Sequence, residues 1–317
     1  MNLVPNQWYA ILDPGEVPAG RPVGWRRMGR DLVFWRSEDG QLRAAEDRCP
    51  HRAAALSIGT VEDGCLTCPF HGFRFADDGS CVKVPAHPDL AISPKMRLAM
   101  VAVREAYELV WMWSGPDAPD EGPVPFFDGF EGTSWRGSQH IVAWPVHYSR
   151  AVENQLDYAH LSFVHRTTIG RFTTPDTEMD VTTEGRRIGF RNDKSPGDGI
   201  QFIGPNVWRL WLAPTLFNFL AFAPVDDEHM VYYLRTYQSR VLVPGLDWMV
   251  NKLSSMFNPR ILAQDQRVVS TQRPKMASLS NGDVYVKSDR PLIEYLKWRE
   301  GLQSQASPTP GRRTPGP

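Results

Sequence analysis

Short apolar stretches separated by turn-forming residues fill the first 114 positions of the chain. Residues 32–47 (LVFWRSEDGQLRAAED) and 73–86 (FRFADDGSCVKVPA) each carry apolar residues on both sides of an Asp-Gly pair. Asp-Gly favours the left-handed backbone that a tight hairpin turn requires, so both segments are predicted to be β-hairpins. A third apolar stretch, 108–115 (ELVWMWSG), closes this part, and residues 1–114 are predicted to form an all-β domain.

The pattern changes after this block. Residues 115–125 (GPDAPDEGPVP) are rich in proline and acidic side chains, which is typical of a linker. Beyond the linker, strand-like segments flank a helical region at 148–165, and segments with helical apolar periodicity follow. These later helices are predicted at 246–257, 259–273 and 289–303.

An antiparallel sheet followed by a packed C-terminal helix predicts an α+β domain with an interior cavity over residues 126–303. The longest apolar stretch, 210–225, contains two prolines and an asparagine and is too short to span a bilayer. It is predicted to form buried strands. The polar, proline-rich residues 304–317 are predicted to be a disordered tail.

Composition narrows the function classes. The 317 residues are 42% hydrophobic and 11% aromatic, which is enough for packed cores. The formal net charge is −1 and no basic run exceeds two residues, which argues against a nucleic-acid or anionic-membrane partner. The first residues lack the basic and apolar regions of a secretory signal, and four cysteines do not suggest a disulfide scaffold. The cytoplasm is the predicted compartment.

Two loops in the all-β part each carry one cysteine and one histidine. Cys49 and His51 are separated by one residue, 16 residues follow, and Cys68 and His71 are separated by two. A structural zinc site is one interpretation, but zinc fingers place like residues in each loop. One thiolate and one imidazole per loop suit a Rieske [2Fe–2S] cluster, in which two cysteines bind one iron and two histidines the other.

The flanking sequences CPHRAAALSIGTV and CPFHGFRFADDGSC resemble the Rieske domain of ring-hydroxylating oxygenases. High-potential Rieske proteins carry an extra cysteine in each loop, where this chain has Ala54 and Arg74. The resemblance therefore implies a low-potential, oxygenase-type cluster and leaves Cys65 and Cys81 as ordinary buried thiols. The residues that it implies as cluster ligands are Cys49, His51, Cys68 and His71.

A second group of polar residues lies in ENQLDYAHLSFVH, from Glu153 to His165. In a regular helix Glu153, Asp157 and His160 share one face, but His165 comes one position too late to join them. The pattern predicts either unrelated roles for these residues or an irregular helix, for example one with a π-bulge. A solvated polar face with one core histidine is the alternative to a functional site.

The spacing E-x₃-D-x₂-H-x₄-H resembles the mononuclear iron motif of Rieske non-heme iron oxygenases. The resemblance implies that His160 and His165 bind iron and that Asp157 connects this iron with a Rieske histidine of a neighbouring subunit. It also implies a carboxylate ligand from a late helix, with one face of the iron left open for O₂ and substrate. Asn154 matches an asparagine that the family places near the iron.

Asp265 is the predicted third ligand. It lies in the middle of an apolar stripe on the predicted helix 259–273, where an unpaired carboxylate is costly. An ion pair with Arg267 or with another arginine is the alternative. The acidic residues at 226–228 are predicted to form a turn between strands and are poorer candidates.

The resemblance covers nearly the whole chain and implies a Rieske domain followed by a helix-grip catalytic domain. The chain is most similar to the branch that contains vanillate O-demethylase oxygenase and dicamba monooxygenase. The implied function is that of a terminal oxygenase that uses O₂ to hydroxylate, or to O- or N-demethylate, a ring-containing substrate. An aromatic-ring cis-dihydroxylating dioxygenase is the alternative, and a Rieske electron carrier is a remote one.

The implied partners follow from what the sequence lacks. It has neither the G-x-G-x-x-G fingerprint nor the plant-type ferredoxin spacing, so electrons must come from a separate NAD(P)H-dependent reductase, with or without a ferredoxin. The branch also implies a head-to-tail homotrimer. Five aromatic residues of the second domain either line a substrate pocket or form core: Trp208, Trp211, Phe217, Phe219 and Phe222.

Overall fold

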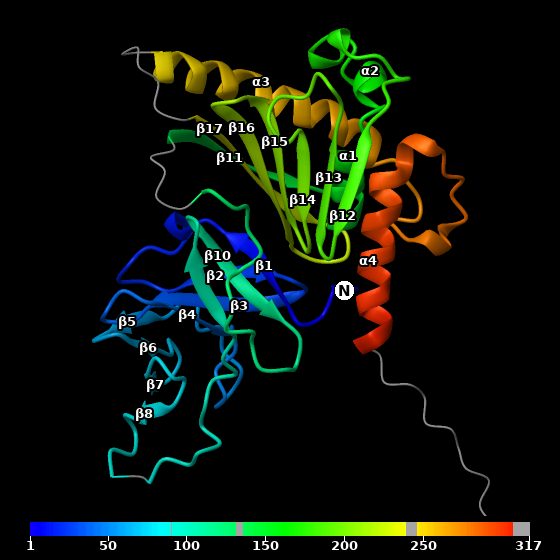
Figure 1. The fold of residues 1–317 in the computed structure, drawn as a ribbon. Helices are drawn as coiled ribbons and strands as arrows, with labels where there is room; N and C mark the ends of the chain where they lie inside the picture. Colours follow the sequence, from blue (N-terminus) through cyan, green and yellow to red (C-terminus); the bar gives the residue numbers. More distant parts are fainter. Residues whose placement is uncertain (90, 131–135, 239–245, 307–317) are drawn as a thin grey trace, which may run out of the picture.

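Short antiparallel strands build the first part of the chain (Figure 1). A computed structural model describes residues 1–89, 91–130, 136–238 and 246–306. In the first part, strands pair into sheets in the orders β1–β10–β9, β2–β3–β4 and β5–β6–β7–β8. The elements are β1 (Gln7–Leu12), η1 (Pro14–Glu16), β2 (Val23–Arg27), β3 (Arg30–Arg36), β4 (Leu42–Glu46), β5 (Thr60–Glu62), β6 (Cys65–Thr67), β7 (Arg74–Phe75), β8 (Cys81–Lys83), β9 (Val103–Ala106) and β10 (Leu109–Ser114).

Both predicted hairpins are present. Strand β3 pairs antiparallel with β4, and β7 pairs antiparallel with β8. Their turns contain Gly40 and Gly79 with φ of 81° and 83°, the left-handed conformation that a glycine adopts without strain. The prediction of an all-β first part is confirmed.

The second part is a mixed sheet-and-helix unit. Its strands form one antiparallel sheet in the order β11–β17–β16–β15–β14–β13–β12. The elements are β11 (Arg136–Trp144), α1 (Tyr148–Leu156), α2 (Leu161–Val164), η2 (Ile169–Phe172), β12 (Asp180–Glu184), β13 (Arg187–Arg191), β14 (Ile200–Ile203), β15 (Val207–Ala213), β16 (Leu216–Pro224), β17 (Met230–Gln238), α3 (Leu246–Val269), η3 (Leu279–Asn281), η4 (Lys287–Asp289) and α4 (Arg290–Ala306).

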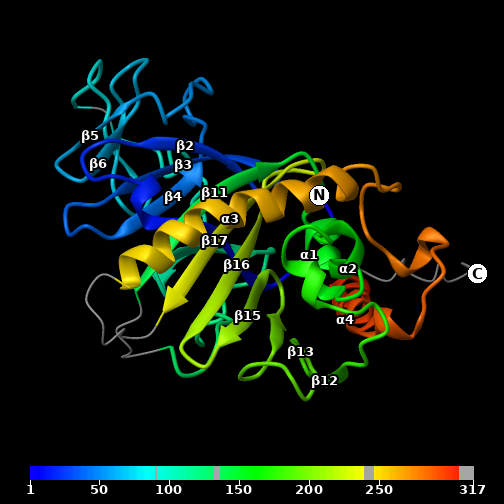
Figure 2. The same ribbon diagram turned by 90° about the horizontal axis from the view of Figure 1, so that it is seen from above.

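The two long helices pack on different parts of the sheet. Helix α3 crosses one face of the sheet, and α4 runs beside its β12–β13 edge (Figures 1 and 2). This is the predicted α+β arrangement of a sheet with packed C-terminal helices. The prediction of two helices separated near Pro259 was wrong, because α3 is continuous through this proline. An interior proline removes one backbone hydrogen bond, and packing against the sheet outweighs that loss.

Helix α4 extends to Ala306, three residues into the stretch predicted to be a disordered tail. Residues 307–317, which make up the rest of that stretch, lie outside the described residues. The predicted linker, 115–125, connects β10 to the second part and contains neither helix nor strand.

Strand β17 shows how the sheet is buried on both faces. Tyr232 and Leu234 belong to the core beneath the helices, whereas Tyr233 and Tyr237 pack against the first part of the chain. The predicted aromatic set divides in the same way, and four of its five members are buried in these cores. Trp208 and Phe222 join the helix-side core, and Phe217 and Phe219 join the other.

Polar side chains hold the two parts of the chain together. Arg235, which is buried on β17, donates to Asp13 Oδ2 at 2.7 Å and to the backbone carbonyl of Glu108 at 2.6 Å. The Asn206 amide donates to the carbonyl of Ala10 at 2.7 Å, while its Oδ1 accepts the Ala10 N–H at 3.1 Å. Since these groups are buried and hydrogen-bonded, the contact is specific in orientation.

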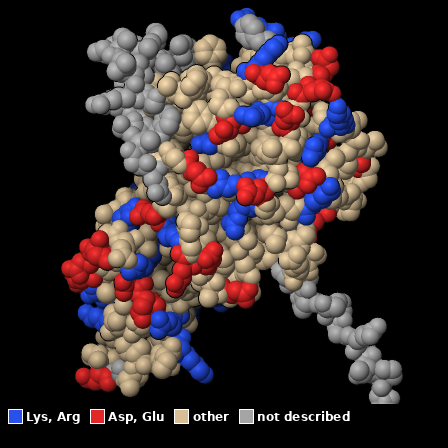
Figure 3. Space-filling view, in the orientation of Figure 1, with Lys and Arg blue, Asp and Glu red and all other residues tan. Residues whose placement is uncertain are grey.

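The surface and the helices add two simple observations. Basic and acidic side chains are interspersed on the face that Figure 3 shows, with no broad field of one sign. Among the described helices, none combines the length and the apolar character that crossing a membrane requires.

Candidate metal centres

The two cysteine- and histidine-containing loops have the same backbone pattern. In each, the cysteine N–H bonds to the carbonyl five residues later: Cys49 to Ala54 at 2.8 Å, and Cys68 to Phe73 at 2.8 Å. The cysteine carbonyl accepts the N–H four residues later, where the backbone has a positive φ of 59° at Ala53 and 69° at Gly72. The loops thus present their side chains in the same way despite spacings of one and two residues.

The side chains of these loops converge. The rings of His51 and His71 lie edge to face with centroids 4.7 Å apart, and Phe73 stacks on His51 at 4.7 Å. Cys49 and Cys68 are each only 2% exposed, whereas His51 is exposed and His71 is half-buried. The thiols therefore face the protein interior and the imidazoles face outward.

The thiol pair fits a cluster. Burial raises the pKa of Cys49 to about 11, and the neighbouring Cys68 adds to the rise, while backbone N–H groups of His51 and Arg52 oppose it. A thiolate here therefore needs a cation beside it, and the amide hydrogen bonds already favour its anionic form. No disulfide links the described cysteines. Cys81 is buried as predicted, but Cys65 is only half-buried.

The helical region that contains the second motif is broken rather than bulged. Helix α1 ends at Leu156, and Asp157 has an extended backbone with φ −96° and ψ 128°. Asp157 Oδ1 accepts the N–H of Ala159 at 2.8 Å, which stabilises the turn. His160 and His165 then flank the single-turn helix α2 as its N-cap and C-cap residues. The break resolves the spacing that a regular helix could not accommodate.

Three residues that are far apart in the sequence meet at this break. Asp265 Oδ1 lies 2.8 Å from His165 Nε2 and 3.5 Å from His160 Nε2. One donor atom from each of the three residues lies within 4.8 Å of the others. Asp265 and His165 are each 1% exposed. The structure therefore brings together the three predicted iron ligands, and Asp265 pairs with histidines rather than with Arg267.

The electrostatics of this triad fit a bound cation. The Asp265 Oδ1 atom is buried, and no group among the described residues donates a hydrogen bond to it with acceptable geometry. Burial lowers the pKa of His165, but the Asp265 carboxylate and the hydrogen bond to Gln264 together more than offset this, so that the pKa lies above its ordinary value. Two imidazoles and one carboxylate are the donor set of non-heme iron centres with open positions. The residues present fit such an ion.

Each histidine of the triad faces a polar side chain with its other ring nitrogen. Asp157 Oδ2 lies 3.5 Å from His160 Nδ1 but forms no hydrogen bond with it, and the predicted role of Asp157 stays a prediction. Gln264 Oε1 lies 2.8 Å from His165 Nδ1, a contact that sequence reasoning missed. Its only signal in the sequence is its position beside Asp265. Asn154 is half-buried, and its Nδ2 has no hydrogen-bond partner in the described part of the chain.

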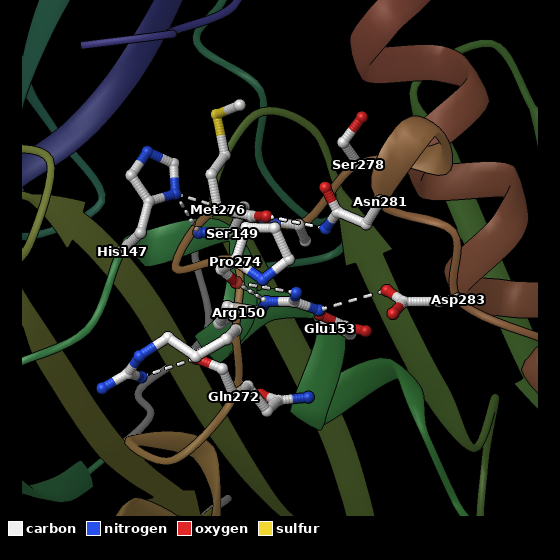
Figure 4. Close-up of polar contacts among 12 residues, drawn as sticks. His147, Ser149, Arg150, Glu153, Gln272, Pro274, Met276, Ser278, Asn281 and Asp283 are labelled. Carbon is white, nitrogen blue, oxygen red and sulfur yellow. Dashed lines mark hydrogen bonds and ion pairs between the residues drawn. The ribbon is translucent and has the colours of Figure 1, made fainter.

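Helix α1 is anchored at its first turn by a buried polar network (Figure 4). Arg150 donates to the carbonyl of Pro274 at 2.8 Å and to Glu153 Oε2 at 2.7 Å. Ser149 Oγ accepts the N–H of Ala277 at 2.9 Å. These bonds connect α1 with the segment that follows α3, and thereby fasten the helix that precedes α2 to the chain that follows the Asp265-carrying helix. Glu153 therefore has a local structural partner.

Replacing Arg150 with methionine is expected to destabilise the fold by roughly 3–5 kcal/mol, the usual effect of removing one partner of a buried ion pair. The reason is that the Glu153 carboxylate, whose side chain is 13% exposed, loses its cation. The double variant Arg150→Met/Glu153→Gln should recover part of the loss. Urea unfolding midpoints measure the stability of the single and the double variant, with the exposed Arg267→Met as control. Equal midpoints for the single and double variants would contradict the expectation.

Two cavities lie next to the turn that precedes α2, although no triad residue lines either of them. Tyr158, two residues before His160, lines two cavities of about 800 and 570 Å³. Both volumes are in the range of small-molecule sites. The smaller cavity reaches Ile200, Leu210 and Trp211 on the sheet. Trp211 is thus the member of the predicted aromatic set that lines a cavity.

A polar cluster lies between the sheet and α3. Thr236 Oγ1 donates to Asn218 Oδ1 at 2.8 Å, and Asn258 Nδ2 donates to Thr236 Oγ1 at 3.0 Å. Thr236 and Asn258 are 1% and 8% exposed. Asn258 precedes Asp265 by seven residues, or about two helical turns, so it lies on the same side of α3. These polar groups satisfy one another in the buried contact between the sheet and α3.

Comparison with known protein families agrees with both metal centres. The Rieske [2Fe-2S] domain model matches residues 7–94, which include both cluster loops. The model of the vanillate O-demethylase oxygenase C-terminal domain matches residues 144–207, which include the broken helix. The prediction of a Rieske domain followed by an oxygenase domain of the vanillate demethylase type is confirmed.

Individual relatives extend the match over the chain. The putative toluene-4-sulfonate monooxygenase system iron-sulfur subunit TsaM2 of Comamonas testosteroni is 33% identical over 58% of this chain and 54% of that protein. The chain thus spans about half the length of the first such relatives. Methylxanthine N3-demethylase NdmB of Pseudomonas putida is 27% identical over 90% of this chain and 84% of that protein.

The fold has solved counterparts. Dicamba monooxygenase bound to dicamba superimposes with a TM-score of 0.81 at 23% identity, covering 98% of this chain and all of that one. The predicted fold class, a Rieske domain followed by a sheet-rich domain with a C-terminal helix, is therefore confirmed.

Proposed function

We propose that this chain, which carries a Rieske domain and a vanillate O-demethylase-type oxygenase domain, is the terminal oxygenase of a monooxygenase or demethylase system. The observation that carries the proposal is the presence of two different donor sets in one chain. One is a pair of thiols with a pair of imidazoles, and the other is two imidazoles with one carboxylate. An electron carrier would need only the first set, since a single cluster suffices for it.

The ligand assignments follow the two donor sets. Cys49, Cys68, His51 and His71 would hold the cluster, and the triad of His160, His165 and Asp265 would hold the iron. When bound, these groups supply one-electron transfer and the activation of O₂. The three triad side chains come from the two ends of α2 and from α3, and three protein ligands would leave coordination positions open for O₂.

The overall reaction then balances as R–H, O₂, two electrons and two protons giving R–OH and water. If the hydroxylated carbon is a methyl on oxygen or nitrogen, the product loses formaldehyde. In the alternative, dihydroxylation, both oxygen atoms enter one product. The vanillate-type C-terminal domain supports monooxygenation.

The substrate is proposed to be a ring-containing molecule with a hydrogen-bonding group. The cavity next to Tyr158 is lined by the apolar side chains of Ile200, Leu210 and Trp211, which suit a ring. Polar side chains such as Thr173 and Asn192 line the same cavity and suit a hydrogen-bonding group of that molecule.

The electron route is proposed to run between subunits of a homotrimer. The cluster loops beside β6 and β7 lie far from α2 in both ribbon views (Figures 1 and 2). Each end carries exposed apolar side chains that a contact between copies would cover: Ile58 and Phe70 at the cluster, Phe163 and Ile169 at α2. Asp157, whose side chain is 31% exposed, would link the iron histidine to the neighbour's cluster histidine.

External electrons are proposed to come from an NAD(P)H-dependent reductase, directly or through a ferredoxin. The cytoplasm is the proposed location, since the free cysteines and the two thiol ligands fit a reducing compartment.

The experiment that tests this function combines metal analysis with isotope labelling. The proposal expects about three irons and two labile sulfides per chain. Turnover under ¹⁸O₂ with a surrogate reductase and a panel of aromatic ethers, acids and N-methyl heterocycles should place one labelled atom in each hydroxylated product. For demethylation the label should appear in the formaldehyde, trapped before it exchanges with water, and not in the demethylated ring product. Two labelled atoms in one product would establish dihydroxylation instead, and two irons per chain would leave an electron carrier.

A further inference from the structure

The outer partner of His165 differs in charge from that of His160. Gln264 Oε1 lies 2.8 Å from His165 Nδ1, and Thr168 Oγ1 lies 3.0 Å from the same oxygen. His160 Nδ1 instead faces the carboxylate of Asp157 at 3.5 Å. One histidine of the triad therefore has a neutral acceptor that a hydroxyl also contacts, and the other faces a carboxylate without a hydrogen bond to it.

Geometry determines which His165 nitrogen faces the triad. Nε2 points to Asp265, so a metal in the triad binds through Nε2 and the proton of the neutral ring stays on Nδ1. That proton needs an acceptor, because His165 is 1% exposed and water cannot supply one freely. Gln264 Oε1 is the acceptor within reach.

Charge explains why an amide suits this position. Asp265 and Asp157 together place two negative charges beside the triad, which balance a divalent cation. A third carboxylate on His165 would add an uncompensated charge next to two residues, Asp265 and His165, that are almost fully buried. An amide orients the imidazole and leaves this balance unchanged.

Resting on the proposed function, we propose that Gln264 is a positioning residue of the mononuclear site. It fixes the tautomer and ring orientation of His165 through Oε1 and keeps the net charge of the occupied site neutral. Its neighbour Gln266 offers a matched control on the same helix, since it has no side-chain hydrogen bond among the described contacts.

The test measures metal binding to the full-length protein after the mononuclear metal has been removed with a chelator. Co(II) serves as the probe, with calorimetry for affinity and EPR for ligand symmetry while the cluster is oxidised. Gln264→Leu is expected to bind Co(II) roughly 10- to 100-fold more weakly, the usual effect of losing an outer acceptor. Gln266→Leu should bind as the unmodified protein does.

The Gln264→Glu variant keeps a hydrogen-bond acceptor for His165 but adds a negative charge, so it tests these two effects separately. It should retain the Co(II) affinity within a few-fold, but it should change the EPR signal and lower the reduction potential of the iron-loaded site. The visible spectrum of the cluster should be the same in all variants, which excludes general unfolding. Wild-type affinity in Gln264→Leu, or affinity in Gln264→Glu as weak as in Gln264→Leu, would overturn the inference. No Co(II) binding by the unmodified chain would instead refute the proposed function.

Discussion

Replacing Asp265 with alanine is expected to reduce the iron content from about three to about two per chain and to abolish substrate oxidation. Asp265 is the sole carboxylate of the triad and is 1% exposed. Without it, two neutral imidazoles must hold a divalent cation, and the only carboxylate left beside the site is the more exposed one of Asp157. Iron analysis, labile sulfide and visible absorption measure the two centres separately.

The matched control is Asp227→Ala. Asp227 lies in the exposed β16–β17 turn, which the sequence predicted and where its side chain is 70% exposed. This variant should retain about three irons and full turnover. An Asp265→Ala protein that keeps its third iron would refute the ligand assignment, and loss of the cluster as well would indicate a folding defect.

Replacing Asp157 with alanine is expected to leave both metals bound and to slow turnover by about 100-fold, at the upper end of the effect of losing an outer partner. Asp157 Oδ2 lies 3.5 Å from His160 Nδ1, and its side chain is 31% exposed. Removing it interrupts the proposed connection between the two centres without removing a ligand.

The measurement is a single turnover. The chemically reduced protein is mixed with O₂ and substrate, and cluster reoxidation is followed by visible absorption. Unmodified protein should reoxidise its cluster as product forms, whereas Asp157→Ala should stay reduced. Glu184→Gln, which changes an exposed carboxylate at the end of β12, is the control. Normal cluster reoxidation in Asp157→Ala would exclude this residue from the electron route.

Several features could be predicted from the sequence because they depend on local rules. Asp-Gly turns between apolar runs determine hairpins, and Gly40 and Gly79 take the expected left-handed conformation. The loops around Cys49 and Cys68 carry chemistry that few other arrangements share, so their residue types alone indicate a cluster. The stretch 210–225 formed strands, because its prolines and length exclude a spanning helix.

The features that sequence reasoning missed depend on contacts between distant segments. Helix α3 continues through Pro259 because packing on the sheet outweighs one lost hydrogen bond. Gln264 could not be recognised because its partner, His165, lies 99 residues away in the sequence. Its role depends on the direction in which α3 presents it, and no local pattern encodes that direction.

The sequence by itself determined the chemistry available to this protein: two thiols, four imidazoles and a buried carboxylate in a recognisable order. Only the tertiary structure brings the Asp265 carboxylate next to the histidines of the triad. It also decides that the helix breaks between Leu156 and Leu161, and which side chains orient the histidine rings. The physical reason is the distance along the chain over which each kind of interaction acts. Turn and spacing preferences act over a few residues, whereas a metal site requires atoms from distant elements to lie within a few ångströms of one another.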